Sequence, residues 1–410
     1  MCGRLPSPGM SETAVVTAFV EAPDGRILLL RRAPSARTYA GRWSGVSGYL
    51  EEDDAHERAL LELAEETGLG SGDVELLGTG PPLAVAGEED DRWLVYPFRF
   101  RCADPARIDL NEENAELVWI EPRELAERET VPGLADAYLH ARFGDRIDAI
   151  ANDRSRGASA LAAVAVGAVA EAAELGLFPL ELGRALAAAR PSMGAVGSAV
   201  GRVLAAAREP DQVVAEAQGL LSARERAPRA IAVLLQPDLT GTVMTHSASA
   251  TVREALLHSP PDRVVCTVSE PIGEGRGFSE ELSAQGLTVE LVADEDAEEA
   301  VSTVDLLLIG ADTVFRDGSL ANKTGTSSLC RGAREAGVPV VVACETIKLS
   351  ASQPREPDEE LFDLTPAGGI DRYVTEDGAF PSGEVHTLVD RTPFLREGHE
   401  LLLGQASPAR

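Results

Sequence analysis

Lysine is nearly missing from this chain: Lys323 and Lys348 are the only two lysines among its 37 basic residues. Acidic residues number 67, which gives a net charge of −30 and an isoelectric point near 4.6. Such a charge disfavours direct binding to nucleic acid or to an anionic membrane, because both would be repelled. The acids are spread along the whole chain, which favours a halophilic, cytoplasmic protein, although a GC-rich genome would also convert Lys to Arg.

Cysteine pairs and long apolar runs are lacking as well. The five cysteines form no C-x-x-C pair and have no His at zinc-ligand spacing, so the sequence predicts reduced, buried thiols. The N-terminus has no signal-peptide pattern, and the longest apolar run, near 158–173, is too rich in Ala for a membrane span. A length of 410 residues with 44% hydrophobic content predicts two or three globular domains.

The first part of the chain predicts a hairpin followed by a helix with an acidic face. Residues 13–20 and 26–31 are rich in strand formers and are separated by Pro-Asp-Gly, which is a turn signal. The following helix is expected to begin at Asp53 or Asp54 and to end before Gly68. One face of this helix carries three carboxylates at spacings of three and four, a set that is either solvated or binds a hard divalent cation: Glu62, Glu65 and Glu66.

This region resembles the Nudix hydrolases, whose box reads G-x5-E-x7-R-E-U-x-E-E-x-G-U, where U is aliphatic. The chain keeps Glu62, Leu63, Glu65, Glu66, Gly68 and Leu69 of that box and has Asp53 at its first Glu. The resemblance implies that Mg²⁺ or Mn²⁺, carried by the three helical glutamates, assists the attack of water on a nucleoside diphosphate derivative. The Arg of the box falls on Leu61, and its first Gly is displaced by one residue, to Gly48. Arg58, one turn before Glu62, is our candidate for the missing cation.

A helical, alanine-rich segment follows the first domain and precedes a region of alternating strands and helices. Five apolar runs are predicted to form a parallel sheet with helices on both faces: 230–235, 263–268, 288–292, 304–309 and 338–343. The fold class is therefore α/β, with a Nudix α/β/α sandwich, a helical bridge and a Rossmann-like sheet. The expected domains are 11–138, 139–227 and 228–398.

Polar residues that suit a phosphate follow several of these strands. Asp312 comes directly after the run 304–309, and Lys323 is followed by small hydroxyl residues, a setting in which an ammonium group binds phosphate. Ser247 and Ser249 add hydroxyls in the segment THSASAT.

The second half resembles a superfamily that contains the alpha, beta and delta subunits of translation initiation factor 2B, methylthioribose-1-phosphate isomerase and archaeal ribose-1,5-bisphosphate isomerase. Asp312 falls at the proton donor of those isomerases. The other matches imply contacts with substrate or its phosphate: Arg156, Gly157, Ala158, Arg190, Asn322, Lys323 and Lys348.

One departure bears on catalysis: Ser247 stands where both isomerases have a catalytic Cys. A serine hydroxyl alone is not a base near neutral pH, whereas a thiolate is. Ala250 replaces an expected lysine, and Glu270 is followed by Pro271 without the usual Arg. Cys266 or Cys344 as a relocated thiol is a less favoured alternative to packed core cysteines.

Three functions are compatible with these patterns. The leading hypothesis is a Nudix-type diphosphate hydrolase fused to a domain that binds a phosphorylated ribose or a nucleotide. The second is an aldose-ketose isomerase acting on a ribose phosphate, and the third is a non-catalytic regulatory subunit of the initiation factor 2B type. The resemblance also implies a homo-oligomer.

Overall fold

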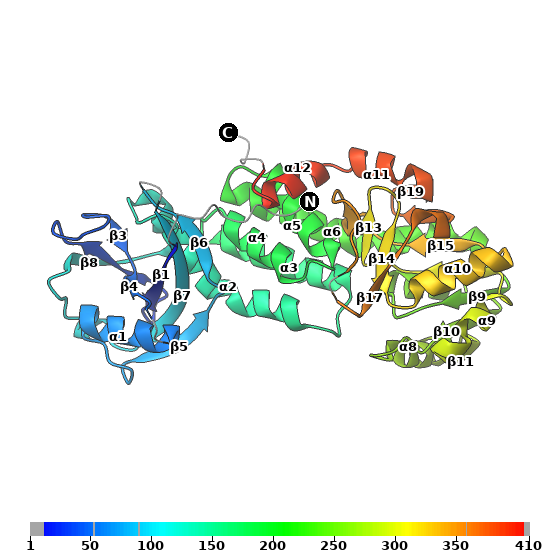
Figure 1. Cartoon of the computed structure of the whole chain (residues 1–410), viewed down its shortest axis with the longest axis horizontal. Coiled ribbons are helices and arrows are strands. Elements are labelled where there is room, and N and C mark those ends of the chain that lie inside the picture. The colour runs from blue at the N-terminus through cyan, green and yellow to red at the C-terminus, as the bar shows by residue number, and fades with distance from the viewer. Residues whose placement is uncertain (1–11, 52–53, 89–90, 358, 406–410) are drawn as a thin grey trace. The chain divides into compact units, whose positions relative to one another are not determined.

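The computed structural model describes residues 12–51, 54–88, 91–357 and 359–405, and it confirms the α/β class (Figure 1). The chain divides into two compact units. The first unit contains Met1–Asn152, Ala168–Ala185 and Glu209–Val214, and the second contains Asp153–Gly167, Leu186–Arg208 and Ala215–Arg410. Within the described part of the chain, none of the helices has both the length and the hydrophobicity that a membrane crossing requires.

The first unit contains an eight-stranded sheet. Its strands are β1 (Glu12–Glu21), β2 (Ile27–Arg32), β3 (Trp43–Ser44), β4 (Val46–Tyr49), β5 (Val74–Thr79), β6 (Leu83–Ala86), β7 (Arg92–Cys102) and β8 (Asn114–Ile120). The order β3-β2-β1-β7-β5 forms the main path, and β4, β6 and β8 pair with β1, β7 and β2. Only the β1–β7 pair is parallel among these described pairings. The predicted hairpin is present, since Glu21 pairs with Ile27 across the turn.

Helix α1 (Ala55–Thr67) packs on this sheet through β4 and β1 (Figure 1). Asp54 caps it by accepting hydrogen bonds from the backbone of His56 and Glu57, while Gly68 ends it in a left-handed conformation with φ of 71°. Asp53, the alternative cap, lies outside the described residues. Ala59 and Leu63 are buried against the sheet, and Glu62 and Glu66 are buried beside them on the same helix.

The segment expected to be helical forms helices α2 (Leu134–Asn152), α3 (Ala158–Glu174), α4 (Leu180–Ala189), α5 (Gly194–Ala206) and α6 (Pro210–Leu235). The strand predicted at 230–235 is wrong, because these residues are the last turns of α6. Ile231 and Leu235 are buried while Val233 and Leu234 are exposed, which is the burial pattern of a helix. The boundaries of a separate helical domain at 139–227 stay a prediction.

Asp136, near the start of α2, is expected to lower the stability of the folded chain. Burial, followed by the charge of Glu181, raises its pKa from 3.8 to about 6. Ionisation therefore costs more in the folded state than in the unfolded state, so Asp136→Asn should stabilise the first unit by about 1–3 kcal/mol at pH 7–8. The gain should vanish below pH ~4, where the aspartate is protonated in both states.

Denaturation followed by tryptophan fluorescence tests this, because all three tryptophans, at 43, 93 and 119, belong to the first unit. The exposed Asp145 on the same helix supplies the control variant Asp145→Asn, for which no change is expected. An equal effect of both variants would contradict the explanation.

The second unit is built on a seven-stranded sheet of order β11-β10-β9-β12-β15-β18-β19. Its strands are β9 (Thr242–Thr245), β10 (Arg263–Thr267), β11 (Val289–Val292), β12 (Leu306–Ile309), β15 (Val340–Ala343), β18 (Arg372–Thr375) and β19 (Gly378–Pro381). All pairs are parallel except β18–β19. Leu307 and Ile309 pack in one core cluster and Leu306 and Leu308 in another, so both faces of the sheet are covered, as predicted.

The helices that alternate with or follow these strands are α7 (Ala250–His258), α8 (Glu274–Ala284), α9 (Ala297–Val301), α10 (Thr326–Ala336), α11 (Val385–Arg391) and α12 (Leu395–Leu402). A second, four-stranded sheet of order β16-β13-β14-β17 has strands β13 (Thr313–Phe315), β14 (Leu320–Lys323), β16 (Leu349–Ser350) and β17 (Phe362–Thr365). The sequence did not predict it. It places Asn322 and Lys323 in a strand, where both side chains are buried.

Candidate functional site

A cavity of about 640 Å³ lies at the carboxyl ends of the parallel strands of the second unit. Strand β9 leads into the THSASAT loop and β12 leads into Asp312, so polar groups from separate strands meet here. The cavity brings together every site residue predicted for the second half of the chain: Arg156, Gly157, Ala158, Arg190, Ser247, Ser249, Asp312, Asn322, Lys323 and Lys348.

Both lysines of the chain line this cavity and are buried. The ammonium Nζ of Lys323 lies 3.2 Å from Oε2 of Glu274, and that of Lys348 lies 3.1 Å from Oε2 of Glu345. Burial acts to lower the pKa of Lys348, but the charges of Glu345 and Asp312 outweigh burial and raise it. Lys348 is therefore a fixed positive charge in the wall of the cavity.

Arg190 adds a third buried cation. It donates from Nε and Nη2 to the two carboxylate oxygens of Glu359 at 3.0 and 3.1 Å, and from Nη1 to the backbone carbonyl of Asp153. Its guanidinium also lies over the ring of Phe362, 5.6 Å from the ring centre. Arg156, by contrast, is exposed and forms an ion pair with Asp153. The guanidinium of Arg190 is thus held rigidly in the wall of the cavity, whereas that of Arg156 lies at its exposed rim.

The carboxyl group of Asp312 binds a proton more tightly than an ordinary aspartate. Burial raises the pKa of its carboxyl group, although Lys348 and Arg190 act to lower the pKa. The backbone N–H of Ala158 donates a hydrogen bond to this carboxyl. A carboxyl group with a raised pKa at the end of a sheet strand is suited to proton donation.

The loop after β9 is held by hydrogen bonds on both sides of Ser247. The buried His246 contacts Oγ1 of Thr267 through Nδ1 at 2.7 Å and the carbonyl of Thr324 through Nε2 at 3.0 Å, and burial lowers its pKa. Ser247 has a φ of 64°, an uncommon conformation for a residue with a side chain. Its Oγ donates to Oε1 of Glu274 at 2.6 Å.

Several residues of this cavity are not predicted from the sequence, and Glu274 and Arg224 are two of them. Glu274 starts helix α8 and contacts both Ser247 and Lys323. Arg224, inside α6, donates from Nε to the carbonyl and hydroxyl oxygens of Ser159. Glu274 stands in the polar segment SEPIGEGRG, which follows β10, whereas nothing in the sequence marks Arg224, because its neighbours form an ordinary helical pattern.

Four cysteines of the described residues are packed in the interior: Cys102, Cys266, Cys330 and Cys344. Cys266 and Cys344 are buried in the two core clusters, and neither lines the cavity. Burial raises the pKa of Cys266 to about 12 and also raises that of Cys344. Neither thiol is placed to act as a base in this cavity.

In the first unit, two of the three predicted metal ligands are buried side by side on α1. Glu62 forms an ion pair with Arg58, the cation suggested by the spacing. Glu66 accepts hydrogen bonds from the backbone of Ser47 at 3.1 Å and from Nδ2 of Asn114 at 2.7 Å. Glu65 is exposed, but its charge still acts on Glu62.

The carboxylates around Glu62 and Glu66 carry more negative charge than Arg58 balances. Burial first, and then the charges of Glu62 and Glu113, raise the pKa of Glu66 to about 7, although the hydrogen bonds from Asn114 and Ser47 act to lower it. Glu113, just before β8, was not predicted from the sequence. In the described residues no three His, Cys, Asp or Glu side chains converge on one point, yet the oxygen donors and their excess charge fit a hard divalent cation in kind.

Gly48 of β4 is required by the position of Glu62. A Cβ built at residue 48 would lie 1.6 Å from Oε1 of Glu62, so Gly48→Ala should displace that carboxylate. We expect a loss of stability of about 1–3 kcal/mol and weaker binding of Mg²⁺, measured by denaturation and calorimetric titration. Gly72→Ala is the control, because a Cβ there meets no atom within 4 Å. Wild-type metal affinity in Gly48→Ala would contradict the role of Glu62.

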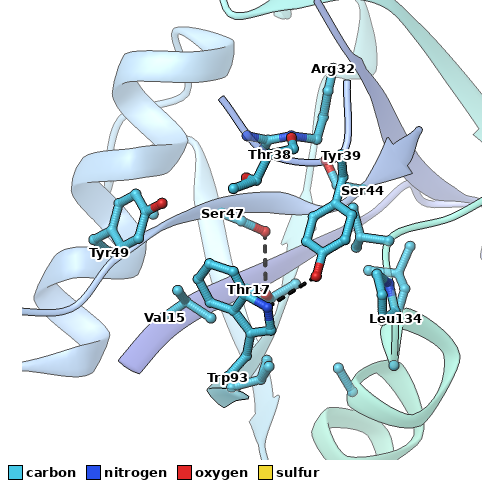
Figure 2. Close-up of a pocket in the computed structure, with 16 residues that line it drawn as sticks. Val15, Thr17, Arg32, Thr38, Tyr39, Ser44, Ser47, Tyr49, Trp93 and Leu134 are labelled. Carbon is cyan, nitrogen blue, oxygen red and sulfur yellow. Dashed lines mark hydrogen bonds between the residues drawn. The ribbon is translucent and has the colours of Figure 1, made fainter. Parts of the chain in front are cut away.

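An aromatic pocket of about 110 Å³ lies beside the same strand (Figure 2). Tyr39, Tyr49 and Trp93 line it, with ring centres 6.2–6.3 Å apart between Trp93 and each tyrosine. Figure 2 shows Nε1 of Trp93 donating to the hydroxyl of Tyr39 at 3.0 Å and the contact between the hydroxyls of Thr17 and Ser47. A flat ring with polar edges suits such a pocket.

Curated relatives match about a quarter to a third of this chain. Ribose 1,5-bisphosphate isomerase of Archaeoglobus fulgidus is 32% identical over 176 residues, covering 36% of this chain and 56% of that protein. The protein of the same name from Haloferax volcanii is 32% identical over 178 residues, covering 36% and 55%. Translation initiation factor eIF2B subunit alpha of Caenorhabditis elegans is 34% identical over 110 residues, covering 26% and 36%. The chain thus spans about half the length of the isomerases that it matches.

Solved structures share the fold of the second half at low identity. The tetrameric eIF2B-beta2-delta2 complex from C. thermophilum matches with a TM-score of 0.54 and 18% identity, over 65% of this chain and 96% of that chain. The eIF2B beta structure from Chaetomium thermophilum matches with a TM-score of 0.52 and 17% identity, over 68% and 94%. The model of the NUDIX domain matches residues 11–141, and that of the Initiation factor 2 subunit family matches residues 156–360, half of the chain. The chain therefore belongs to the Initiation factor 2 subunit family and carries an N-terminal NUDIX domain.

Proposed function

We propose that the second unit binds a phosphorylated ribose or a nucleotide in its cavity and that the NUDIX domain hydrolyses a nucleoside diphosphate derivative. The observation that carries the first part is the gathering of Lys323, Lys348 and Arg190 in one cavity of a chain with a net charge of −30. The chain has only two lysines, and both are buried in the wall of this cavity. That placement supports a bound anion, because six basic and four acidic side chains line the cavity, so its wall is net positive in a strongly acidic chain. Ammonium and guanidinium groups held in fixed positions are good donors to phosphate oxygens.

The size and lining of the cavity support a sugar phosphate as that anion. About 640 Å³ accommodates a pentose with one or two phosphates, and Ser249 and Asn322 offer neutral polar groups for sugar hydroxyls. Two of the relatives are named for a ribose bisphosphate. We extend that ligand class, and no more, to this chain.

Thermal unfolding with ligands tests the binding. Ribose 5-phosphate, ribose 1,5-bisphosphate and AMP are compared with unphosphorylated ribose, and a phosphorylated ligand that binds the native state must raise the midpoint. Lys323→Met and Lys348→Met should remove the shift. No shift with any phosphorylated ligand at millimolar concentration would reject the proposal.

For the NUDIX domain, the proposal depends on the acidic face of α1 and the aromatic pocket being close to the same strand. Ser47 and Gly48 of β4 contact Glu66 and Glu62 and also line the pocket. The metal would be held by Glu62 and Glu66 with help from Glu65, and when bound it would polarise a diphosphate oxygen and activate water. The pocket would hold the base of the nucleotide.

Incubation with ADP-ribose and related diphosphates in the presence of Mg²⁺ or Mn²⁺ tests the hydrolysis. Product release that stops when EDTA removes the metal supports the proposal. Absence of product across the panel with both metals rejects it. Because the three tryptophans lie in the first unit, quenching of Trp93 fluorescence by a nucleotide gives a second readout that does not require turnover.

We also propose that the chain forms a homo-oligomer. The complex from C. thermophilum that shares its fold is tetrameric. Light scattering after size-exclusion chromatography tests this, and a mass of 43.2 kDa at all concentrations would reject it.

A further inference from the structure

The carboxylate of Glu274 is placed as a reactive group in the cavity of the second unit. Its Oε1 accepts a hydrogen bond of 2.6 Å from Oγ of Ser247, and its Oε2 lies 3.2 Å from Nζ of Lys323. The side chain is 23% exposed and faces the cavity. It therefore contacts Ser247, the residue that stands where the similar isomerases have their catalytic cysteine.

The other acidic side chains of this cavity are less suited to act as a base. Glu345 is buried in an ion pair with Lys348, and Glu225 is exposed on α6. Asp312 is near enough for the charge of Glu274 to act on it, and its carboxyl group holds its proton more tightly than usual. Two acids in one site with different surroundings can divide the roles of proton donor and proton acceptor.

We propose that Glu274 is the general base of an aldose-ketose isomerisation in this cavity, with Ser247 and Lys323 as its positioning residues. This inference rests on the proposed binding of a phosphorylated ribose and adds a reaction to it. The substrate class is a cyclic aldose that carries a phosphate on its C1 oxygen.

The reaction balances without any oxidant or reductant. The carboxyl group of Asp312 gives its proton to the ring oxygen, the bond from C1 to that oxygen breaks, and the carboxylate of Glu274 removes the proton from C2, so that a C1–C2 double bond forms. Glu274 then returns a proton to C1, while the C2 hydroxyl gives its proton back to Asp312. The product is the open-chain ketose with its C1 phosphate ester intact, and both carboxyl groups regain their first states.

The surrounding structure fixes Glu274 in position. It is the first residue of α8, where the helix N-terminus favours a negative charge. Gly275 lets the helix begin tightly against β10, because a Cβ at that residue would lie 1.8 Å from the carbonyl oxygen of Thr267. On the other side, the backbone N–H of Ser247 donates to Oγ of Ser269 at 2.8 Å, which holds the strained loop that presents the serine hydroxyl.

The experiment follows ribose 1,5-bisphosphate by ¹H and ³¹P NMR in D₂O with the full-length protein. Wild type should form a ketose bisphosphate, with deuterium at C1 in those turnovers in which the proton held by Glu274 exchanges with D₂O before it is returned. Glu274→Gln should keep ligand binding in the thermal assay but lose at least 100-fold in turnover. Glu274→Asp, which keeps a carboxylate, should recover part of the rate, and the control Glu225→Gln, on the same cavity, should behave as wild type.

Each other outcome overturns a specific claim. Turnover within threefold of wild type in Glu274→Gln removes Glu274 as the base. Binding without turnover by wild type overturns the isomerase inference, leaves the proposed ligand binding intact and favours the non-catalytic regulatory subunit. No binding by wild type rejects the proposed function, and this inference with it. For Ser247→Ala we expect a turnover number about tenfold lower at unchanged KM, which a purely structural serine would not produce.

Discussion

Replacement of Lys348 by methionine should destabilise the second unit by about 3–5 kcal/mol, which is a large share of the stability of a domain. The side chains of Lys348 and Glu345 are 8% and 4% exposed, and their charged atoms are 3.1 Å apart. Removal of the ammonium leaves the Glu345 carboxylate buried with its main partner gone, and that residual charge is the source of the cost.

A double variant distinguishes the electrostatic contribution of the Lys348–Glu345 pair to stability from the contribution of side-chain packing. In Lys348→Met with Glu345→Gln both charges are absent, so stability should return to within about 1–2 kcal/mol of wild type. Tryptophan fluorescence reports the first unit alone, so calorimetry or circular dichroism is needed to follow the second. If the single and double variants are equally unstable, the loss comes from side-chain packing instead of the unpaired carboxylate.

The double variant should also lose the ligand-induced thermal shift although it folds. That outcome would separate the two roles of Lys348, because stability depends on the pair and phosphate binding depends on the ammonium itself.

Much of the fold could be predicted because its signals are local. The run Leu306–Ile309 is apolar on both faces and so reads as a central strand, and Gly68 ends α1 where a left-handed conformation is needed. Strand β9 was missed because it has only four residues, Thr242–Thr245, of which two are threonines. The neighbouring run 230–235 is more apolar and favours a strand from its sequence alone, although its burial follows a helix.

In the candidate site, too, local sequence signals place some residues and not others. Polar residues directly after a strand, such as Asp312, could be placed from the sequence because parallel strands end at one edge of the sheet. Glu274 and Glu113 could not, since their importance comes from neighbours 27 to 51 residues away in the chain, such as Ser247 and Glu62, which only the tertiary fold brings close. The sequence therefore predicts which polar groups lie at strand ends, but not the partners that hold these groups or shift their pKa.

Replacement of Arg58 by alanine should reduce diphosphate hydrolysis by the NUDIX domain about 10–100-fold. Burial already raises the pKa of Glu62, and the guanidinium of Arg58 is the group that opposes this. Without it, the buried Glu62 loses its ion pair, and its ionised form, which a metal requires, becomes less favourable. The rate with ADP-ribose and Mg²⁺ is the measurement.

Two further variants decide whether Arg58 has this specific role. Arg107→Ala removes an exposed ion pair with Asp73 in the same domain and should leave the rate unchanged. Leu61→Arg, added to Arg58→Ala, restores the cation at the position that the Nudix box normally uses, and Leu61 is exposed enough to accept it. Recovery of activity in that double variant means that the arginine of this chain stands three residues earlier but still places its charge beside Glu62. A rate that does not recover means that the geometry of the Arg58–Glu62 pair itself is required. An unchanged rate in Arg58→Ala alone means that the pair only stabilises the helix.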